Sequence, residues 1–244
     1  MRAFEVQRGE RVLFAFTHPD DELTVAAFLA RLLAQGVAIH VCWSHSTPVR
    51  ERESRAALAT IGVRQEDMTF FDAPDGRVVD TISVLKPKLC GLIQKFGPTR
   101  IVTHAFEQGH IDHDATNLLV NMCFSGPVFE TPFYHTYLTR LQRLYSFSTK
   151  DGEETIALTP QERRMKRRLV GMYPSQTVRR NVVVYELAHA VTMRKPPLFQ
   201  CERLRRQRHT DFLTPNHPPL LAERLTKSPT WQRWESTIKS HLGA

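Results

Sequence analysis

Cysteine is scarce in this 244-residue sequence, and the cysteines it has stand far apart. The four of them occupy positions 42, 90, 123 and 201, without a C-x-x-C pair. Such spacing argues against a zinc ribbon and against a secreted scaffold held together by disulfides. Because thiols stay reduced in the cytoplasm, we expect a cytoplasmic protein.

Long apolar runs are also missing. No stretch approaches the ~18 consecutive apolar residues of a membrane-spanning helix. Residues 1–10 are mixed and charged, without the apolar centre of a secretory signal, and no repeats or low-complexity tracts divide the chain. We therefore expect one domain over residues 1–244, in which 1–125 form the core and 126–244 add further strands, a basic helix and a C-terminal helix.

Acidic residues are outnumbered by basic ones, 25 against 33, which leaves a formal net charge of +8. The excess is arginine-rich and falls late in the chain, between Arg163 and Arg208. A basic surface attracts nucleic acid, anionic membranes or phosphorylated substrates. A solvated helix face is the simpler explanation for Gln161–Leu169, where Met165 and Leu169 trace a buried side. No stretch resembles an RNA-binding strand or a helix-turn-helix, so a nucleic-acid partner is not expected.

Short apolar runs alternate with amphipathic stretches along the first half of the chain. The predicted strands are Arg11–Phe16, Val37–Trp43, Met68–Phe71 and Ile101–Thr103, and the predicted helices are Leu23–Ala34, Arg50–Ile61, Thr81–Phe96 and Ala115–Cys123. This alternation predicts an α/β fold of Rossmann-like, three-layer type, with a mainly parallel sheet and helices on both faces. Right-handed crossovers would bring the loops after the four strands to one edge of the sheet.

The second half carries weaker signals. We expect a hairpin of Leu144–Phe147 with Thr155–Leu158 around a Lys-Asp-Gly turn, and a late strand over Asn181–Leu187. Thr159 and Pro160 are typical of a helix start and predict where the basic helix begins. The arginine- and proline-rich stretch 194–219 is expected to be a loop near the mouth of the site.

A last helix is predicted to begin at Ser228-Pro229. Trp231, Trp234, Ile238 and Leu242 would form one apolar line at helical spacing. We expect this line to dock on the domain, rather than to form an oligomer or membrane-surface contact.

Polar side chains gather directly after the first predicted strand. His18 is followed by the acids Asp20, Asp21 and Glu22, just before a helix. One interpretation is that an aspartate caps that helix and His18 fills space. However, three consecutive carboxylates repel one another unless a cation or hydrogen bonds compensate, and histidine with carboxylate can bind zinc.

A second polar cluster follows the fourth predicted strand. It contains His104, Glu107, His110 and His113. Each histidine taken singly is typical of a solvated loop. Together, however, the two clusters can supply the two nitrogens and one oxygen that leave one zinc position open for water.

These clusters resemble the motifs of the PIG-L/LmbE-like zinc deacetylases, the N-acetylglucosaminyl deacetylases. His18–Glu22 matches the family's first motif and Gly109–Ala115 its second. Arg50–Val63, Phe71–Gly76 and, more weakly, Tyr173–Gln176 resemble three further family segments. The resemblance implies a Rossmann-like fold with the metal site at the carboxyl ends of the strands.

The resemblance also implies roles for individual residues. His18, Asp21 and His113 would bind zinc, although iron(II) or cobalt could occupy the same ligands. Asp20 would be the general base that takes a proton from the attacking water. His110, in protonated form, would stabilise the oxyanion.

Further residues would support the metal and the substrate. Asp112 would not bind the metal itself but would orient His110 or a metal ligand through a hydrogen bond. Arg50 and Asp75 would bind the sugar. Two positions depart from the family pattern: Ile111 replaces a proline, which changes loop stiffness, and Gln108 stands where the mycothiol branch carries a tyrosine. The resemblance therefore does not extend to the substrate of that branch.

The resulting prediction is a zinc-dependent enzyme that hydrolyses the N-acetyl group of an N-acetylglucosamine-type sugar or conjugate. One alternative is the same machinery acting on another N-acyl group in natural-product or thiol-cofactor biosynthesis. Another is a basic nucleic-acid-binding module whose histidines are incidental. The expected partner is a small-molecule glycoside or amino-sugar conjugate, and the sequence leaves a homo-oligomer open.

Overall fold

The computed structural model describes residues 2–138, 144–176, 182, 184–187, 191 and 197–242. Among these residues, seven strands form one sheet in the order β3-β2-β1-β4-β5-β7-β6. The strands are β1 (Arg11–Phe16), β2 (Ala38–His45), β3 (Met68–Ala73), β4 (Arg100–His104), β5 (Val128–Thr131), β6 (Glu153–Ala157) and β7 (Cys201–Arg206). Strands β1 to β5 run parallel, whereas β7 is antiparallel to both of its neighbours. The predicted α/β class with a mainly parallel sheet is confirmed.

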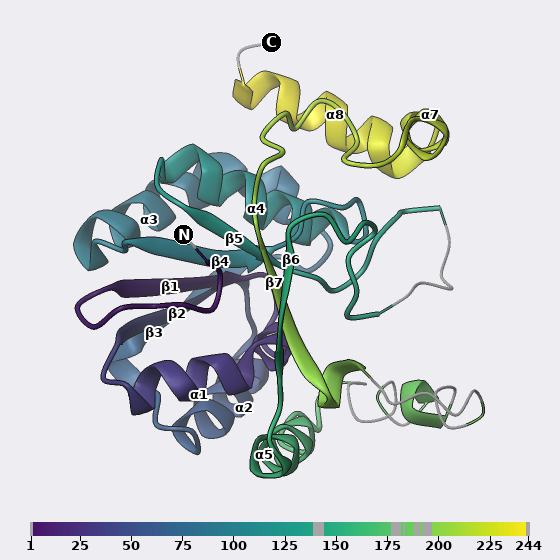
Figure 1. The fold of residues 1–244 in the computed structure, drawn as a ribbon. Helices are drawn as coiled ribbons and strands as arrows, with labels where there is room; N and C mark the ends of the chain where they lie inside the picture. The colour runs from purple at the N-terminus through teal and green to yellow at the C-terminus, as the bar shows by residue number, and fades with distance from the viewer. Residues whose placement is uncertain are drawn as a thin grey trace.

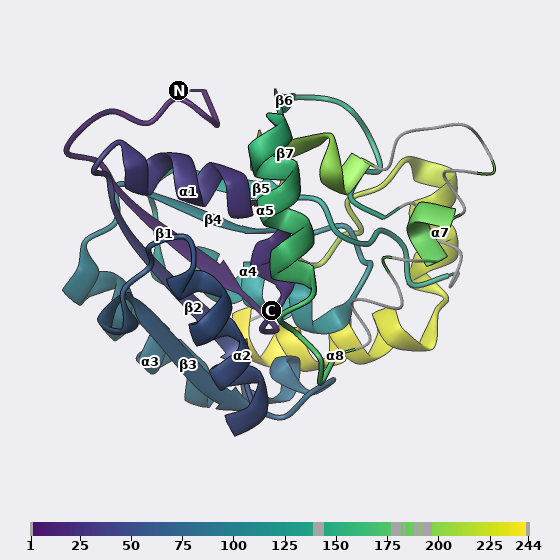
Figure 2. The same ribbon diagram turned by 90° about the horizontal axis from the view of Figure 1, so that it is seen from below.

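Helices cover both faces of the sheet (Figure 1). They are α1 (Ala26–Ala34), α2 (Pro48–Ala59), α3 (Ile82–Phe96), α4 (Ile111–Cys123), α5 (Pro160–Val170), α7 (Pro219–Thr226) and α8 (Pro229–Leu242), with short 3-10 turns η1 (Asp21–Thr24), η2 (Gln65–Asp67), η3 (Val78–Thr81) and η4 (Pro197–Phe199). Figure 2 shows α1, α2 and α5 across one face. Within the described residues, every helix is too short or too polar to cross a bilayer.

Strand β1 shows why both faces are covered. Val12, Phe14 and Phe16 pack with α1 on one face, whereas Leu13 and Ala15 pack on the other face with α3 and α4. Successive side chains of a strand point to opposite faces, so an uninterrupted apolar run needs a cover on each side. The strand is therefore central in the sheet, and its carboxyl end opens between the two helical layers.

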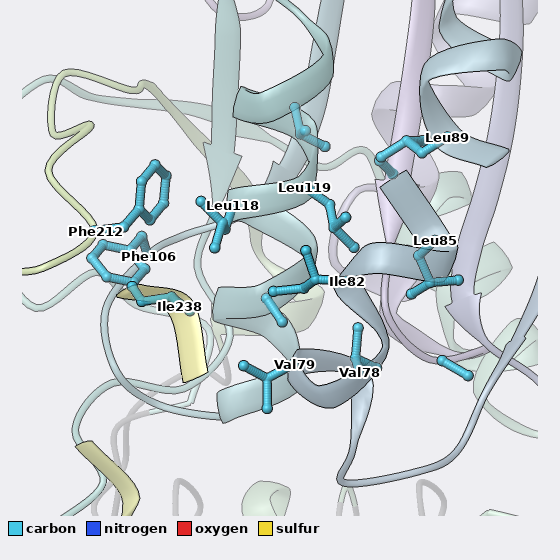
Figure 3. Packing of buried hydrophobic residues seen from close by; sticks show 14 of the residues in the cluster. Val78, Val79, Ile82, Leu85, Leu89, Phe106, Leu118, Leu119, Phe212 and Ile238 are labelled. Atoms are coloured by element: carbon cyan, nitrogen blue, oxygen red, sulfur yellow. The ribbon is translucent and has the colours of Figure 1, made fainter. Parts of the chain in front are cut away.

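The C-terminal helix α8 docks on the second apolar layer. Trp231, Trp234 and Ile238 are buried there, and Figure 3 shows Ile238 beside Phe106 and Phe212. The predicted docking is confirmed, but the apolar line ends earlier than expected because Leu242 is 40% exposed.

Two strand predictions for the second half are wrong. Residues 144–147 are not a strand, and β6 pairs with β7 instead. Of the expected strand Asn181–Leu187, positions 182 and 184–187 are helical, while 181 and 183 lie outside the described residues. Val182 and Tyr185 are both buried, at helical spacing, so the β-branched run there concealed a helical pattern.

The stretch 194–219, expected as a loop, contains strand β7; its positions 194–196 lie outside the described residues. The charged side chains of β7 concealed it, because they are paired inside the protein. Glu202 accepts hydrogen bonds from the backbone of Ala27 and Phe28 at 2.9 and 2.7 Å, and from Lys166 at 2.8 Å. It thereby caps α1, whose own N-cap side chain makes no capping bond.

A disulfide joins α3 to α4, which the sequence did not predict. Cys90 and Cys123 are separated by 33 positions, and their Cα atoms lie 4.9 Å apart. Their proximity follows from the packing of two helices, which spacing alone does not reveal. Cys42 is free and buried, and burial raises the pKa of its thiol to about 12.

Candidate metal centre

Three potential metal ligands converge where β1 and β4 end. His18, Asp21 and His113 are buried, and one donor atom from each lies within 4.8 Å of the others. Asp21 Oδ2 is 3.6 Å from His18 Nδ1 and 3.6 Å from His113 Nε2. Atoms bound to one tetrahedral zinc at about 2.0 to 2.2 Å lie roughly 3.3 to 3.6 Å apart. This donor set therefore fits a single zinc ion.

Hydrogen bonds join the two motifs that carry these ligands. The His18 N–H donates to Asp21 Oδ2 at 2.7 Å, which fixes the first motif as it turns into η1. The Thr17 hydroxyl donates to the carbonyl of Asp112 at 3.1 Å and pairs with Thr116 at 2.7 Å. The end of β1 is thus bonded directly to the first turn of α4, which brings His113 towards Asp21.

Two of the three ligand candidates hold the protonation state that a metal requires. Burial opposes ionisation of Asp21, but His113 and His104 stabilise its carboxylate and hold its pKa well below the usual range. Burial, with the neighbouring His104, lowers the pKa of His113 well below its usual value. A carboxylate and a neutral imidazole are the forms that bind divalent cations. The third candidate is His18: burial lowers its pKa, but hydrogen bonds with Asp112, Asp21 and Asp75 raise the pKa well above its usual value. A metal would therefore have to displace the proton of this ring.

His104 is a contributor to this centre to which the sequence assigned no role. Its Nε2 lies 3.1 Å from Asp21 Oδ2, and its ring stacks on His113 with centroids 3.8 Å apart. It is the last residue of β4, so the signal that identifies it is its place at the carboxyl end of a strand.

A second group of candidate ligands overlaps the first and consists of His18, His110 and Asp112. Both Asp112 oxygens, however, already accept backbone hydrogen bonds, from Gly76 at 2.6 Å and Val78 at 3.0 Å. Asp112 thus fixes the loop after β3 and lies 3.7 Å from His18 Nε2, behind the first group. We therefore take His18, Asp21 and His113 as the better metal site.

Asp20 lines the pocket and does not cap a helix through its side chain. It precedes η1 with no side-chain capping bond, and its backbone is left-handed, with φ of 113°. The interpretation of an aspartate cap at this position is therefore wrong. Burial and the neighbouring carboxylates of Asp21 and Glu22 raise the pKa of Asp20 well above its usual value, which suits a group that must accept a proton.

His110 presents a neutral N–H to the pocket, rather than the protonated ring expected from the sequence. Its Nδ1 accepts a hydrogen bond from the backbone of Asp112 at 3.3 Å, which leaves the proton on Nε2. Burial, with the neighbouring His18, lowers the pKa of His110 and favours this neutral form.

Asp75 contacts the metal cluster more closely than a purely sugar-binding role requires. Its Oδ1 is 3.1 Å from His18 Nε2, and its Oδ2 is 3.5 Å from Arg50 Nη2. The hydrogen bond with His18 holds the pKa of Asp75 below its usual value, although the side chain is 53% exposed. Asp75 therefore connects the candidate ligand His18 with Arg50.

These side chains enclose a pocket of about 200 Å³. It is lined by His18, Asp20, Asp21, Arg50, Asp75, His110, His113, Phe133, Tyr134 and Gln176. The structure thus brings together all the predicted site residues except Asp112, which lies beneath them. Phe133, Tyr134 and Gln176 come from the second half of the chain, and Phe133 and Tyr134 are site residues that the sequence did not predict.

Gly109 allows the aromatic wall to approach the second motif. A Cβ atom at this position would lie 2.2 Å from the carbonyl carbon of Tyr134, so no other residue fits without moving the backbone. The ring of Tyr134 packs on His113 with centroids 5.8 Å apart.

The fold and the site define an α/β protein with a candidate metal centre at the carboxyl ends of its strands. Residues 13–124 match the model of the PIG-L family, described as GlcNAc-PI de-N-acetylase. The resemblance predicted from the sequence is confirmed over these residues.

Individual relatives are more distant. A probable N-acetyl-alpha-D-glucosaminyl L-malate deacetylase 2 of Bacillus cereus is 30% identical over 145 residues, or 51% of this chain and 66% of that protein. The chain thus matches just under two thirds of that relative's length.

Solved structures share the fold at low identity. The zinc-inhibited form of teicoplanin deacetylase Orf2 matches with a TM-score of 0.58 at 19% identity, over 82% of this chain and 99% of that one. GalB, the 4-carboxy-2-hydroxymuconate hydratase from Pseudomonas putida KT2440, matches with a TM-score of 0.55 at 15% identity, over 83% and 98%. Proteins with different described activities share this fold, so function has to be argued from the site.

Proposed function

We propose that this protein is a zinc-dependent N-deacetylase that hydrolyses the N-acetyl group of an N-acetylglucosamine-type sugar or conjugate. One observation carries the proposal: His18, Asp21 and His113 converge on the wall of a pocket that Asp20 and His110 also line. A proton acceptor and a hydrogen-bond donor beside a metal centre are the groups that amide hydrolysis needs.

The protein groups divide the reaction between them. When bound, a zinc ion would supply a nucleophilic water at neutral pH and polarise the acyl oxygen. Asp20 accepts a proton from the attacking water and returns it to the leaving nitrogen, which requires a carboxyl group with a raised pKa. The Nε2–H of His110 donates to the oxygen that becomes negative as the acyl carbon turns tetrahedral.

Substrate recognition falls to the rest of the pocket. Phe133 and Tyr134 offer flat surfaces on which a sugar ring can stack. Arg50 and Asp75 form an ion pair on the pocket wall and carry polar atoms suited to sugar hydroxyls. The relative from Bacillus cereus is described as acting on a glucosaminyl malate, which supports a glycoside as the substrate class.

The fold supports treating residues 1–244 as one domain. Strands β5, β6 and β7 from the second half extend the same sheet as β1 to β4. The site also takes residues from both halves, so neither half contains the whole pocket.

The decisive experiment is a substrate panel with metal removal. Metal-free protein should release no acetate from N-acetylglucosamine conjugates, and added zinc should restore the release. Release of a different acyl group from the same panel would favour the alternative amidohydrolase. Salt-dependent duplex binding without any zinc-dependent hydrolysis would favour the nucleic-acid-binding module.

A further inference from the structure

We propose that Glu22 is a positioning residue for the general base Asp20, an inference that rests on the function proposed above. Asp20 has φ of 113° and ψ of −20°, a backbone conformation that residues other than glycine rarely adopt. Its backbone N–H donates to Glu22 Oε2 at 2.9 Å. A strained residue keeps its conformation only where its surroundings enforce it, and this hydrogen bond supplies such a restraint.

Glu22 is itself held from three other parts of the chain. It is fully buried, and it accepts hydrogen bonds from Trp43 Nε1 in β2 at 3.0 Å, from Ser54 Oγ in α2 at 2.9 Å and from the Tyr173 hydroxyl. Together with the Asp20 N–H, four donors fix this carboxylate. A carboxylate saturated in this way cannot rotate without leaving a buried donor unpaired.

The two oxygens of Glu22 have different hydrogen-bond partners, and this difference defines the role of the residue. Oε1 faces Ser54 and Tyr173, whereas Oε2 faces Trp43 and the backbone of Asp20. One oxygen is thus anchored to the scaffold while the other restrains the residue whose side chain enters the pocket. Glu22 does not line the pocket, so it acts through Asp20 and not on the substrate.

The same carboxylate connects the site to the Tyr173–Gln176 segment. Two residues beyond Tyr173, Ser175 bonds to Glu53 through its N–H at 2.8 Å and its hydroxyl at 2.6 Å. Gln176, the next residue, lines the pocket. The segment Tyr173–Gln176 is therefore bonded to Glu22 at Tyr173 and to Glu53 at Ser175. These bonds fix the position of Gln176 in the pocket wall.

The test is Glu22→Gln in the full-length, zinc-loaded protein. An amide group cannot accept hydrogen bonds at both ends, and each oxygen of Glu22 accepts from two donors, so two of the four donors face an NH₂ group. We expect kcat to fall roughly 10²-fold, because a base displaced by a fraction of an ångström loses its alignment, while KM and zinc content stay within about twofold of the wild type. Tyr173→Phe, which removes one donor only, should give a smaller fall in kcat with KM unchanged.

Glu202→Gln is the matched control, because Glu202 is an equally buried carboxylate that touches neither the pocket nor Asp20. It should lower the melting temperature but leave kcat unchanged. If Glu202→Gln reduced kcat as much as Glu22→Gln, the loss would reflect general destabilisation and the proposal would be wrong.

Two further readouts separate this proposal from the proposed function. In an Asp20→Asn background, Glu22→Gln should not lower kcat any further. A further fall in kcat as large as the one in the wild-type background would contradict the proposal. A crystal structure of Glu22→Gln should show Asp20 leaving its left-handed conformation, and an unchanged φ would overturn the idea even if no substrate were found. Wild-type protein that releases no acetate with zinc bound would instead contradict the proposed function.

Discussion

Two of the regions that contain buried charges differ in the partners of those charges. At the carboxyl ends of β1 and β4, Asp21 forms its ion-pair contacts, within the described residues, with histidines alone. On the antiparallel side of the sheet, Glu202 pairs with Lys166 at 2.8 Å, and Arg205 pairs with Glu130 at 2.7 Å and Glu107 at 2.9 Å.

The two regions differ in whether the buried carboxylate has a lysine or arginine as its partner. The carboxylates of Glu202 and Glu130 already have a lysine or an arginine as partner, so they have no need of a bound cation, and removing that partner would leave a buried charge unpaired. Asp21 faces histidine rings beside a pocket, and histidine can give up its proton, which leaves Asp21 able to bind a cation. Burial of charge therefore does not identify the site. The distinguishing feature of Asp21 is burial on the wall of a pocket without a lysine or arginine partner. Changes in the first region should alter rate, and changes in the second should alter stability.

The largest expected effect belongs to the first region. Asp20→Asn keeps the size of the side chain but removes the proton acceptor, so kcat should fall by roughly 10²- to 10⁴-fold. Zinc content and melting temperature should stay at wild-type values, since the ligands are untouched. Steady-state rates together with metal analysis check this, and a fully active variant would show that Asp20 is not the base.

The second-largest expected effect is a loss of stability when a buried ion pair of the second region is broken. Lys166→Met leaves the buried carboxylate of Glu202 without its cation, which should lower the free energy of unfolding by about 3 to 5 kcal/mol. Its kcat at 25 °C should remain within about twofold of the wild type, because Lys166 does not line the pocket and bonds to η1 only at the carbonyl of Thr24, at 3.4 Å. Denaturant titration and rate measurements on one preparation test both halves of the expectation. A loss of rate without a loss of stability would contradict the division between the regions.

His110→Ala distinguishes the two overlapping ligand groups. If His18, Asp21 and His113 hold the metal, the variant should keep its zinc and lose roughly 10²- to 10³-fold in kcat through the missing oxyanion donor. If the group of His18, His110 and Asp112 holds it, zinc will be lost together with activity. Metal content therefore decides between the two sites.

The smallest expected effect is a pH dependence of stability in the second region. Burial, with the nearby Glu130, raises the pKa of Glu107 from 4.5 to about 7 although Arg205 opposes the shift. The folded state then binds more protons than the unfolded state between these values. The stabilising contribution is complete below pH 4.5 and is lost as the pH rises to 7.

Glu107→Gln should remove this dependence. The unfolding free energy of the wild type, relative to that of the variant, should fall by on the order of 3 kcal/mol between about pH 4.5 and 7 and stay level above it. Denaturant unfolding at several pH values measures the difference. Parallel curves for the two proteins would contradict the raised pKa.

The sequence predicted which candidate ligands lie together but not the contacts that support them. His18, Asp21 and His113 lie in short motifs directly after apolar strands, where local pattern and strand direction are enough to place them. The bond between Glu22 and Tyr173 spans 151 positions and that between Lys166 and Glu202 spans 36, so no local pattern reveals either. Strand β7 was missed for the same reason, because its charges are neutralised only by the tertiary structure.

The central claim is that the first and second motifs bind one zinc ion between them, and metal analysis of His113→Ala tests it most directly. Purified wild-type protein should carry about one zinc ion per chain, and His113→Ala should lose nearly all of it. His40→Ala, which removes a buried histidine bonded to Thr69 and away from the pocket, should keep its zinc. Retention of the wild-type zinc content by His113→Ala would contradict the account.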